Sequence, residues 1–147
     1  MGMCPQFNSF LEQLTVKENL QFIARIKGLS SHEINQNVEL KVTTMDLHEF
    51  LNVPAKQLSG GNKRKLSCAM TMMLRPHAEF LDEPTTGVDP VSRRSLFKLI
   101  KKLKDTSIVL TTHRMDEAEH LCDQIAIMIN GAIVVYGTPT YLMHQYG

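Results

Sequence analysis

The chain has 147 residues, of which 43% are hydrophobic and 21% are charged, and its formal net charge is +1. These proportions are ordinary for a globular chain that buries a core, and the length suits one domain. The near-neutral charge gives no electrostatic basis for binding nucleic acid or an anionic membrane. The sequence holds no signal peptide and no apolar run long enough to span a bilayer.

The three cysteines, Cys4, Cys68 and Cys122, are far apart and show no metal-ligand spacing. An odd number of separated cysteines indicates reduced thiols in a cytosolic setting. Patterned sequence begins almost at Met1 and stops abruptly at Gly147. We therefore expect the chain to be a fragment of a larger domain.

The first third of the chain is predicted to be helical after a short strand that Pro5 breaks. Ser/Thr-x-x-Glu capping boxes at Thr15 and Ser30 each open a helix with apolar residues at helical spacing. The predicted elements are the end of a strand at 1–5, a helix from Thr15 to Gly28, a helix from Ser30 to about Met45, and a short helical or irregular piece at 46–56.

The remaining sequence alternates strands and helices, which indicates an α/β layer with parallel strands between His77 and Ile129. The carboxyl ends of such strands lie on one side of the sheet, where open α/β sheets bind their ligands. We predict a loop at 58–62, a helix from about 63 to 74, a strand at 77–81, a helix from Pro90, a strand at 107–111, a helix at 115–122, a hairpin of 124–129 with 132–136, and a short helix after Thr138-Pro139.

An acid pair, Asp82 and Glu83, directly follows the strand at 77–81. Two carboxylates at the end of a buried strand are costly unless something cationic or reactive lies there. The next strand ends at Thr112-His113, so we expect His113 to converge with the acid pair. In such a set, one carboxylate can hold Mg²⁺, a second can polarise a water molecule, and an imidazole can donate a hydrogen bond to a phosphoryl oxygen. This set predicts nucleotide hydrolysis.

A second candidate site is the segment Ser59-Gly60-Gly61 ahead of a helix. Exposed backbone N–H groups, a hydroxyl and a helix N-terminus bind anions, and Lys63 and Arg64 would strengthen the positive potential there. The alternative is that Ser59 is an ordinary N-cap with glycines for the turn. Asp89 likewise has the position of an N-cap, because Pro90 follows it at the first helical position.

Five segments in one order resemble the motifs of the ABC ATPase superfamily. They are Cys4-Pro5-Gln6 as the Q-loop, Leu58-Ser59-Gly60-Gly61-Asn62 as the signature loop, Phe80-Leu81-Asp82-Glu83-Pro84 as the Walker B strand, Gly87-Val88-Asp89 as the D-loop, and His113 as the switch histidine. The resemblance covers nearly the whole chain and is strongest to the A subfamily of ABC transporters, which move lipids. The segments that indicate this subfamily are 4–8, 61–67 and 127–131, with Asn62 in place of the more common glutamine.

The resemblance implies an ATP-binding and hydrolysing domain with Mg²⁺ as cofactor. Asp82 is implied to hold Mg²⁺ and Glu83 to activate the attacking water. Gln6 is implied to sense Mg²⁺ and to couple the site to a membrane domain, and His113 to contact the γ-phosphate.

The remaining implied roles concern a partner domain. Ser59, Gly60 and Gly61 are implied to bind ATP held by a second nucleotide-binding domain in a head-to-tail pair, and Asp89 to cross that interface. The implied fold is a partial P-loop NTPase fold over residues 1–147, with a helical subdomain at about 9–75, an α/β core portion at 76–147, and a C-terminal β-hairpin with a short helix. The other implied partners are the transmembrane domains of a transporter, which place the chain at the cytoplasmic side of a membrane.

The sequence departs from the family pattern in two places. No Gly-x-x-x-x-Gly-Lys-Ser/Thr segment occurs, so the loop that cradles the β- and γ-phosphates is missing and we expect the isolated chain to be inactive. Glu79 stands where the family has a hydrophobic strand residue. The missing loop leaves open an alternative, a degenerate non-catalytic module that completes a partner's ATP site. A soluble ABC ATPase acting on nucleic acid is disfavoured by the neutral charge.

Overall fold

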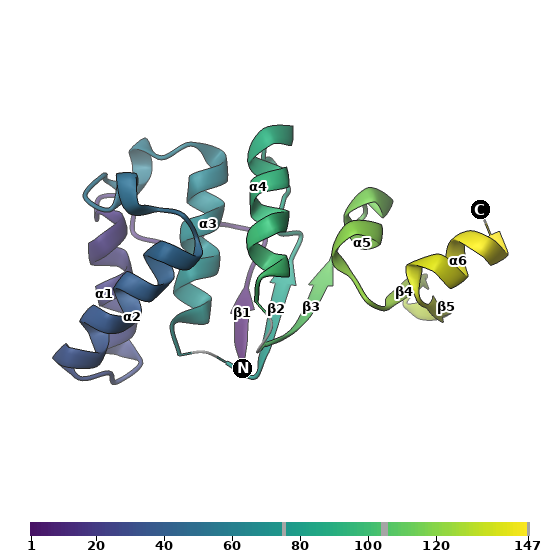
Figure 1. The fold of residues 1–147 in the computed structure, drawn as a ribbon, viewed down its shortest axis with the longest axis horizontal. Helices are drawn as coiled ribbons and strands as arrows, with labels where there is room; N and C mark the ends of the chain where they lie inside the picture. The colour runs from purple at the N-terminus through teal and green to yellow at the C-terminus, as the bar shows by residue number, and fades with distance from the viewer. Residues whose placement is uncertain (75, 104–105, 147) are drawn as a thin grey trace. The chain divides into compact units, whose positions relative to one another are not determined.

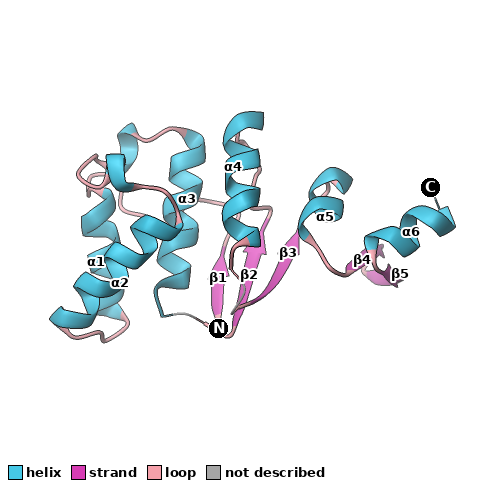
Figure 2. Cartoon of the chain, in the orientation of Figure 1, coloured by secondary structure: helices cyan, strands magenta, loops and turns pink. Residues whose placement is uncertain are grey.

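The computed structural model describes residues 1–74, 76–103 and 106–146 (Figure 1). It forms two compact units, Met1–Thr111 and Thr112–Gly147, which are described here one at a time. The first unit holds a parallel sheet and most of the helices, and the second holds a hairpin and two helices (Figure 2). The chain thus has the α/β class predicted for it. The division expected at residue 75 falls outside the described residues, and the predicted subdomain split stays a prediction.

The sheet of the first unit has three parallel strands in the order β1-β2-β3. Their register pairs Cys4 with Leu81 and Asp82 with Thr111. The strands are β1 (Gly2–Cys4), β2 (Ala78–Asp82) and β3 (Ser107–Thr111), and helix α4 (Pro90–Lys101) lies between β2 and β3 in the chain. Because the strands are parallel, the loops that follow β1 and β2 leave from the same edge of the sheet.

The strand predicted at 124–129 forms, but it does not extend the parallel sheet. Strand β4 (Ile125–Ile129) pairs with β5 (Ala132–Gly137) in a separate antiparallel hairpin. Asn130 and Gly131 at its turn have φ values of 51° and 81°, as a tight hairpin turn requires. The strand–helix–strand pattern alone suggested a parallel partner, and the short turn settles the pairing in favour of the neighbouring strand.

The helices of the first unit begin where their capping residues predict. The Thr15 hydroxyl accepts a hydrogen bond from the Glu18 backbone, and the Ser30 hydroxyl accepts one from the Glu33 backbone. In each box the glutamate side chain accepts a bond from the backbone of the cap. The buried side of α1 carries Asn19, whose amide binds the carbonyls of Leu11, Leu14 and Thr15 and so fixes the loop that leads from β1. The helical elements are α1 (Val16–Ile26), α2 (Ser31–Thr44), η1 (His48–Phe50), η2 (Ala55–Gln57), α3 (Gly60–Thr71) and η3 (Met72–Leu74).

Helix α3 begins three residues earlier than predicted. Ser59 is its N-cap, and the Ser59 hydroxyl accepts a hydrogen bond from the Asn62 backbone at 3.3 Å. Gly60 and Gly61 therefore belong to the first helical turn instead of a preceding loop. The serine cap outweighs the weak helix propensity of the two glycines. Helix α3 then packs against β1 and α4 and becomes part of the core.

The two faces of the sheet differ in what covers them. Leu81 and Glu79 on β2 are buried, with exposed fractions of 1% and 0%. Side chains on the opposite face lie in one row across the sheet, because Met3, Phe80 and Val109 are register partners, and all three are exposed. This face is therefore open in the structure.

Glu79 on β2 is a fully buried carboxyl group. Neither carboxylate oxygen has a hydrogen-bond partner among the described residues. A Cβ atom added at Gly2, its neighbour on β1, would lie 2.0 Å from Glu79 Oε2, so a side chain there would require the carboxyl group to move. Burial raises the pKa of Glu79 and outweighs the opposing influence of Thr71, Lys27 and Lys41. The carboxyl group replaces a core side chain at a cost in stability.

The second unit is small. Helices α5 (Met115–Leu121) and α6 (Pro139–Tyr146) accompany the hairpin. Its buried centre consists of Ala118, Ile125 and Leu142. None of the helices in the described parts of the chain is both long and apolar enough to cross a membrane.

Candidate functional site

Asp82 and Glu83 lie at the carboxyl end of β2 and are fixed by Thr111, the last residue of β3. The Thr111 hydroxyl donates to Asp82 Oδ1 at 2.5 Å. The Glu83 backbone N–H donates to the hydroxyl and the carbonyl of Thr111, at 3.1 and 3.2 Å. The predicted acid pair is thus joined to the neighbouring strand. Sequence reasoning missed Thr111, although a hydroxyl at the matching end of the next strand was a usable signal.

Glu83 has a backbone conformation that is uncommon for a residue with a side chain. Its φ angle is 45°, in the left-handed region. The turn that follows is closed by two bonds from Thr86, one from its N–H to the Glu83 carbonyl and one from its hydroxyl to Glu83 Oε2, both at 3.1 Å. Strained conformations of this kind persist where the surroundings impose them, and they cluster at functional sites.

Arg64 on α3 holds the loops after β1 and β2 together. Its exposed fraction is 4%. Nη2 donates to the Asp82 carbonyl at 2.7 Å and Nε to the Pro84 carbonyl at 2.8 Å. Nη1 donates to the carbonyls of Pro5 and Gln6, at 2.6 and 3.2 Å. The expectation that Arg64 adds positive potential at the anion site is wrong, because its buried guanidinium instead binds these four carbonyls.

Gln6 lies two residues beyond the end of β1, at the edge where Asp82 and Glu83 end β2. Its backbone is held by Arg64, and its side chain is exposed. The register of Cys4 with Leu81 places the two loops side by side. The structure therefore brings Gln6, Asp82 and Glu83 to one edge of the sheet, together with Thr111.

The N-termini of α3 and α4 pack against each other. A Cβ atom at Gly61 would lie 2.4 Å from Ser92 Cβ on α4, so only glycine fits this buried position. Ser59 and Gly60 precede it and are exposed. Asp89 caps α4, because its Oδ1 accepts the N–H groups of Val91 and Ser92, both at 3.0 Å.

The capping role accounts for the electrostatics of Asp89. Hydrogen bonds from Ser92 lower the pKa of its exposed carboxyl group. The carboxylate is therefore charged at neutral pH, at the positive end of the α4 dipole. Whether Asp89 also crosses an interface stays a prediction.

His113 belongs to the second unit and is exposed, two positions after the end of β3. Beside it, the Thr112 hydroxyl donates to Glu117 Oε2 at 2.5 Å and accepts from the Arg114 N–H at 3.1 Å. These bonds fix the start of α5. The approach of His113 to the acid pair stays a prediction.

The edge of the sheet offers oxygen atoms of the kind that Mg²⁺ prefers, from the Asp82 carboxylate and the Thr111 hydroxyl. Within the described residues, no three His, Cys, Asp or Glu side chains are grouped closely enough to hold a metal by themselves. Mg²⁺ usually keeps several waters and binds through one or two carboxylates and substrate phosphates. The residues fit that mode of binding.

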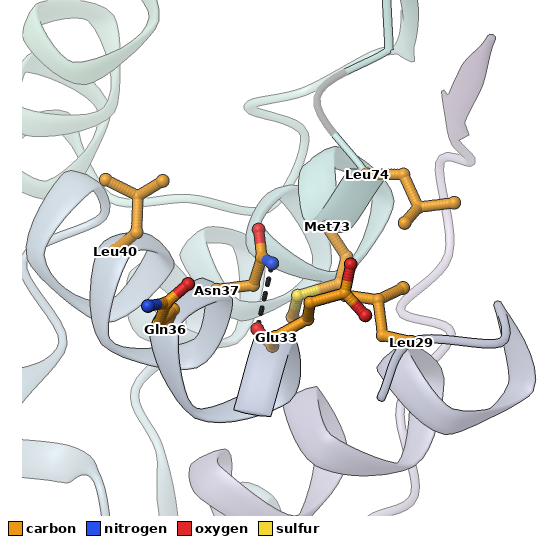
Figure 3. Close-up of a pocket in the computed structure, with 7 residues that line it drawn as sticks. All are labelled: Leu29, Glu33, Gln36, Asn37, Leu40, Met73 and Leu74. Carbon is orange, nitrogen blue, oxygen red and sulfur yellow. Dashed lines mark hydrogen bonds between the residues drawn. The ribbon is translucent and has the colours of Figure 1, made fainter. Parts of the chain in front are cut away.

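A groove elsewhere on the first unit holds none of these residues. Its volume is about 380 Å³, and it lies between α2 and the segments that contain Leu29 and η3 (Figure 3). Asn37 in this groove donates to the Glu33 carbonyl at 2.9 Å. Apolar side chains, two amides and Glu33 line the groove, and the Glu33 carboxylate is bound to Ser30 at the start of α2.

The sequence from residue 1 to residue 86 matches the model of a protein family described as ABC transporter. The chain belongs to the ABC transporter family. The match includes the segments that resemble the signature loop, the Walker B strand and the Q-loop, and Arg64 binds the backbones of the last two in the structure.

Relatives across the whole chain are transporters of the A subfamily. ABC transporter A family member 6 of Arabidopsis thaliana is 43% identical over the full length of this chain, which spans 16% of that relative. ATP-binding cassette sub-family A member 2 of Homo sapiens is 42% identical, and the chain spans 6% of it. These matches support the subfamily resemblance and show that the chain corresponds to a small part of each relative.

A solved structure with the same fold is cbiO1 of Clostridium perfringens, described as part of the ABC transporter complex cbiONQ. Its TM-score is 0.89 at 26% sequence identity, and the match covers 98% of this chain and 59% of that protein. The ABC ATPase fold class is therefore confirmed.

Proposed function

We propose that the chain contributes the Walker B side of an ATP-hydrolysing site that drives a transporter of the A subfamily. The observation that carries the proposal is the fixation of Asp82 and Glu83 at the strand edge by Thr111 and Arg64. Carboxylates held in a set geometry at such an edge suit metal binding and activation of water.

Each side chain has a distinct role in this proposal. Asp82 would help to hold Mg²⁺, with Thr111 orienting its carboxylate. Glu83 would accept the proton of the attacking water, and the turn that Thr86 closes after β2 would orient its side chain. Gln6 would sense Mg²⁺ from the neighbouring loop, and His113 would donate a hydrogen bond to the γ-phosphate. Mg-ATP, when bound, supplies the reacting phosphoryl group and its charge.

The N-terminus of α3 would serve a second nucleotide-binding domain arranged head to tail. Ser59 and Gly60 are exposed there, and helix N-termini bind phosphate through free N–H groups. The buried Gly61 lets α3 approach α4, which brings Asp89 to the same surface. Ser59, Gly60, Gly61 and Asp89 would thus complete the partner's ATP site.

The wider setting follows from the subfamily. We propose that the chain acts with transmembrane domains at the cytoplasmic side of a membrane, and that the transported substrate is a lipid. The names of the relatives support transport by an A-subfamily protein, and the lipid rests on the subfamily resemblance alone.

One observation favours a second candidate function. The sequence has no Gly-x-x-x-x-Gly-Lys-Ser/Thr segment, so the chain on its own lacks the loop that holds β- and γ-phosphates. A non-catalytic module that only completes a partner's site would need Ser59 and Gly60 but would not need Glu83.

Two measurements test the proposal. Titration of the isolated chain with Mg-ATP by calorimetry is expected to show no micromolar binding, and such binding would contradict the idea of an incomplete site. Fusion of the chain behind the Walker A half of an A-subfamily relative is expected to restore ATP turnover. An Asp82→Asn version of the fusion is expected to lose it, whereas equal turnover would favour the non-catalytic module.

A further inference from the structure

Cys4 and Cys68 form a buried thiol pair that connects the sheet to α3. Their sulfur atoms lie 3.9 Å apart, although 64 positions separate the residues in sequence. Both side chains have an exposed fraction of 0%. Cys4 ends β1, directly before Pro5 and Gln6, and Cys68 lies one turn after Arg64 on α3. No role in the proposed ATP site involves either thiol.

The surroundings make the two thiols unequal. The hydrogen bond with Cys68 lowers the pKa of Cys4, and the charge of Arg64 acts in the same direction. The bond with Cys4 and burial raise the pKa of Cys68. Cys4 ends β1 beside the exposed loop of Gln6, whereas Cys68 lies inside α3, so we assign Cys4 as the attacking thiol and Cys68 as the resolving thiol.

We propose that Cys4 and Cys68 are a reversible oxidation site, at which a small peroxide converts the two thiols into an intramolecular disulfide that links β1 to α3. The Cys4 thiolate attacks one oxygen of hydrogen peroxide, the O–O bond breaks, and hydroxide leaves, which takes up a proton to become water. The resulting sulfenic acid is attacked by the Cys68 sulfur, which loses its proton as a second water leaves. In total, two thiols are oxidised and one peroxide is reduced to two waters.

The geometry supports this site. A disulfide has an S–S distance of about 2.0 Å, so the two sulfurs must approach each other by roughly 2 Å to form the bond. Both thiols are fully buried, so oxidation requires a local opening of the structure, which admits peroxide more readily than a bulky oxidant such as glutathione disulfide. The bond would tie the loop of Pro5 and Gln6 covalently to the helix that carries Arg64 and Ser59.

The full chain provides its own control thiol. Cys122 is half-buried in the second unit, and burial raises its pKa. Cleavage after lysine and arginine, except before proline, places Cys4, Cys68 and Cys122 on separate peptides, 1–17, 66–93 and 115–147. The spacing from Cys68 to Cys122 is 122 − 68 = 54 positions, close to the 64 positions between Cys4 and Cys68. An unfolded chain therefore forms the two loops with similar ease.

The experiment treats the folded chain with graded hydrogen peroxide, blocks the remaining thiols under denaturing conditions and maps the peptides by mass spectrometry. A parallel sample is oxidised in guanidinium chloride. We expect the linked peptides 1–17 and 66–93 to dominate in the folded sample and to separate on addition of dithiothreitol. In the denatured sample the Cys4–Cys68 and Cys68–Cys122 links should appear in comparable amounts. Methionine oxidation adds oxygen to these peptides without linking them.

Variants complete the test. The link should persist in Cys122→Ser and disappear in Cys4→Ser and Cys68→Ser, and oxidised Cys122→Ser should unfold at a higher denaturant concentration than its reduced form. The proposal is overturned if the folded and denatured samples give the same pairing ratio. It is equally overturned if Cys4 and Cys68 in the folded chain stay reduced or oxidise separately to sulfinic acids. The wild-type maps decide these outcomes even if a variant does not fold.

Discussion

Arg64 Nη2 lies 2.7 Å from the main-chain oxygen of Asp82, so the signature helix directly holds the residue proposed to bind Mg²⁺. The same guanidinium binds the carbonyl of Gln6, on the loop proposed to sense that metal. A shift of α3 would therefore move both loops together. Arg64 therefore connects α3, whose N-terminus would serve a partner domain, to the loop of Asp82 and Glu83, which would perform hydrolysis in this domain.

Replacement of Arg64 is expected to destabilise the fold. Arg64→Met leaves the carbonyls of four residues, most of them partly buried, without their donor, and hydrogen bonds to a charged group contribute about 1.5–3 kcal/mol each. We expect the free energy of unfolding to fall by at least about 3 kcal/mol in denaturant titrations. Arg64→Lys should recover little of this, because an ammonium group lacks the planar fork of donors. Lys63→Met, on the same helical turn, is the control, and an equal loss in that variant would contradict the argument.

Gly61 is expected to tolerate no side chain. Gly61→Ala places a methyl group against Ser92 Cβ and should cost about 1–3 kcal/mol through overpacking. Gly60→Ala is the matched control, because a Cβ atom there meets only the Gly87 carbonyl, at 3.5 Å. The double variant Gly61→Ala/Ser92→Gly should regain part of the loss. Independent, additive effects of the two substitutions would show that the helices do not meet at this point.

Thr111 is expected to act through its hydroxyl. Thr111→Val keeps the shape but removes the donor to Asp82 and an acceptor for Glu83, so stability should fall by about 0.5–1.5 kcal/mol. Thr111→Ser retains the hydroxyl and should stay close to wild type. Denaturant midpoints measure both effects. If Val and Ser prove equivalent, the contact with Asp82 contributes nothing measurable.

Glu79 is expected to reduce stability at neutral pH. Glu79→Leu replaces an unpartnered buried carboxyl group with an apolar side chain of similar size and should raise the free energy of unfolding by about 1–3 kcal/mol. A loss of stability in this variant would show that the carboxyl group has a favourable partner in the folded chain.

The pH dependence of the same residue has a defined sign. Burial raises the pKa of Glu79 in the folded chain above its ordinary value of 4.5, against the influence of Thr71, Lys27, Lys41 and the N-terminal amine. Between the ordinary and the raised pKa, the folded chain keeps a proton that the unfolded chain releases. Its contribution to stability is therefore complete below pH 4.5 and is lost as the pH rises through the raised value.

The comparison that isolates this contribution is wild type against Glu79→Gln. Other carboxyl groups change stability with pH in the opposite direction, because hydrogen bonds from Thr15 and Ser30 lower the pKa values of Glu18 and Glu33. We therefore expect the stability of wild type relative to Glu79→Gln to rise as the pH falls from neutral toward 4.5. A difference that stays constant over this range would contradict the raised pKa.

Sequence patterns predicted the elements of this fold well where local chemistry decides the outcome. Capping boxes located α1 and α2, the Asn130-Gly131 turn located the hairpin, and Asp89 with Pro90 located the start of α4. The sequence did not decide which sheet β4 belongs to, because a buried apolar strand has the same pattern in a parallel sheet and in a hairpin.

The sequence predicted the two acidic residues of the candidate site, but it did not predict the residues that hold them, Arg64 and Thr111. Asp82 and Glu83 stand out because charged groups at the end of an apolar strand need a reason. The inward direction of Arg64 depends on carbonyls that come from two distant loops, and sequence spacing does not show that they converge. Thr111 becomes significant only when the strand register is known, because the register sets it opposite Asp82.

We propose that Glu83 activates the attacking water at an ATP site that a Walker A half completes. The most direct test measures steady-state ATP turnover of the fusion described above with Glu83 and with Glu83→Gln, which keeps size and removes the base. We expect turnover to fall by about 10²-fold or more in Glu83→Gln, as loss of a general base produces, with both proteins equally folded. Turnover within a factor of about two of wild type would contradict it, because general-base catalysis contributes far more than that.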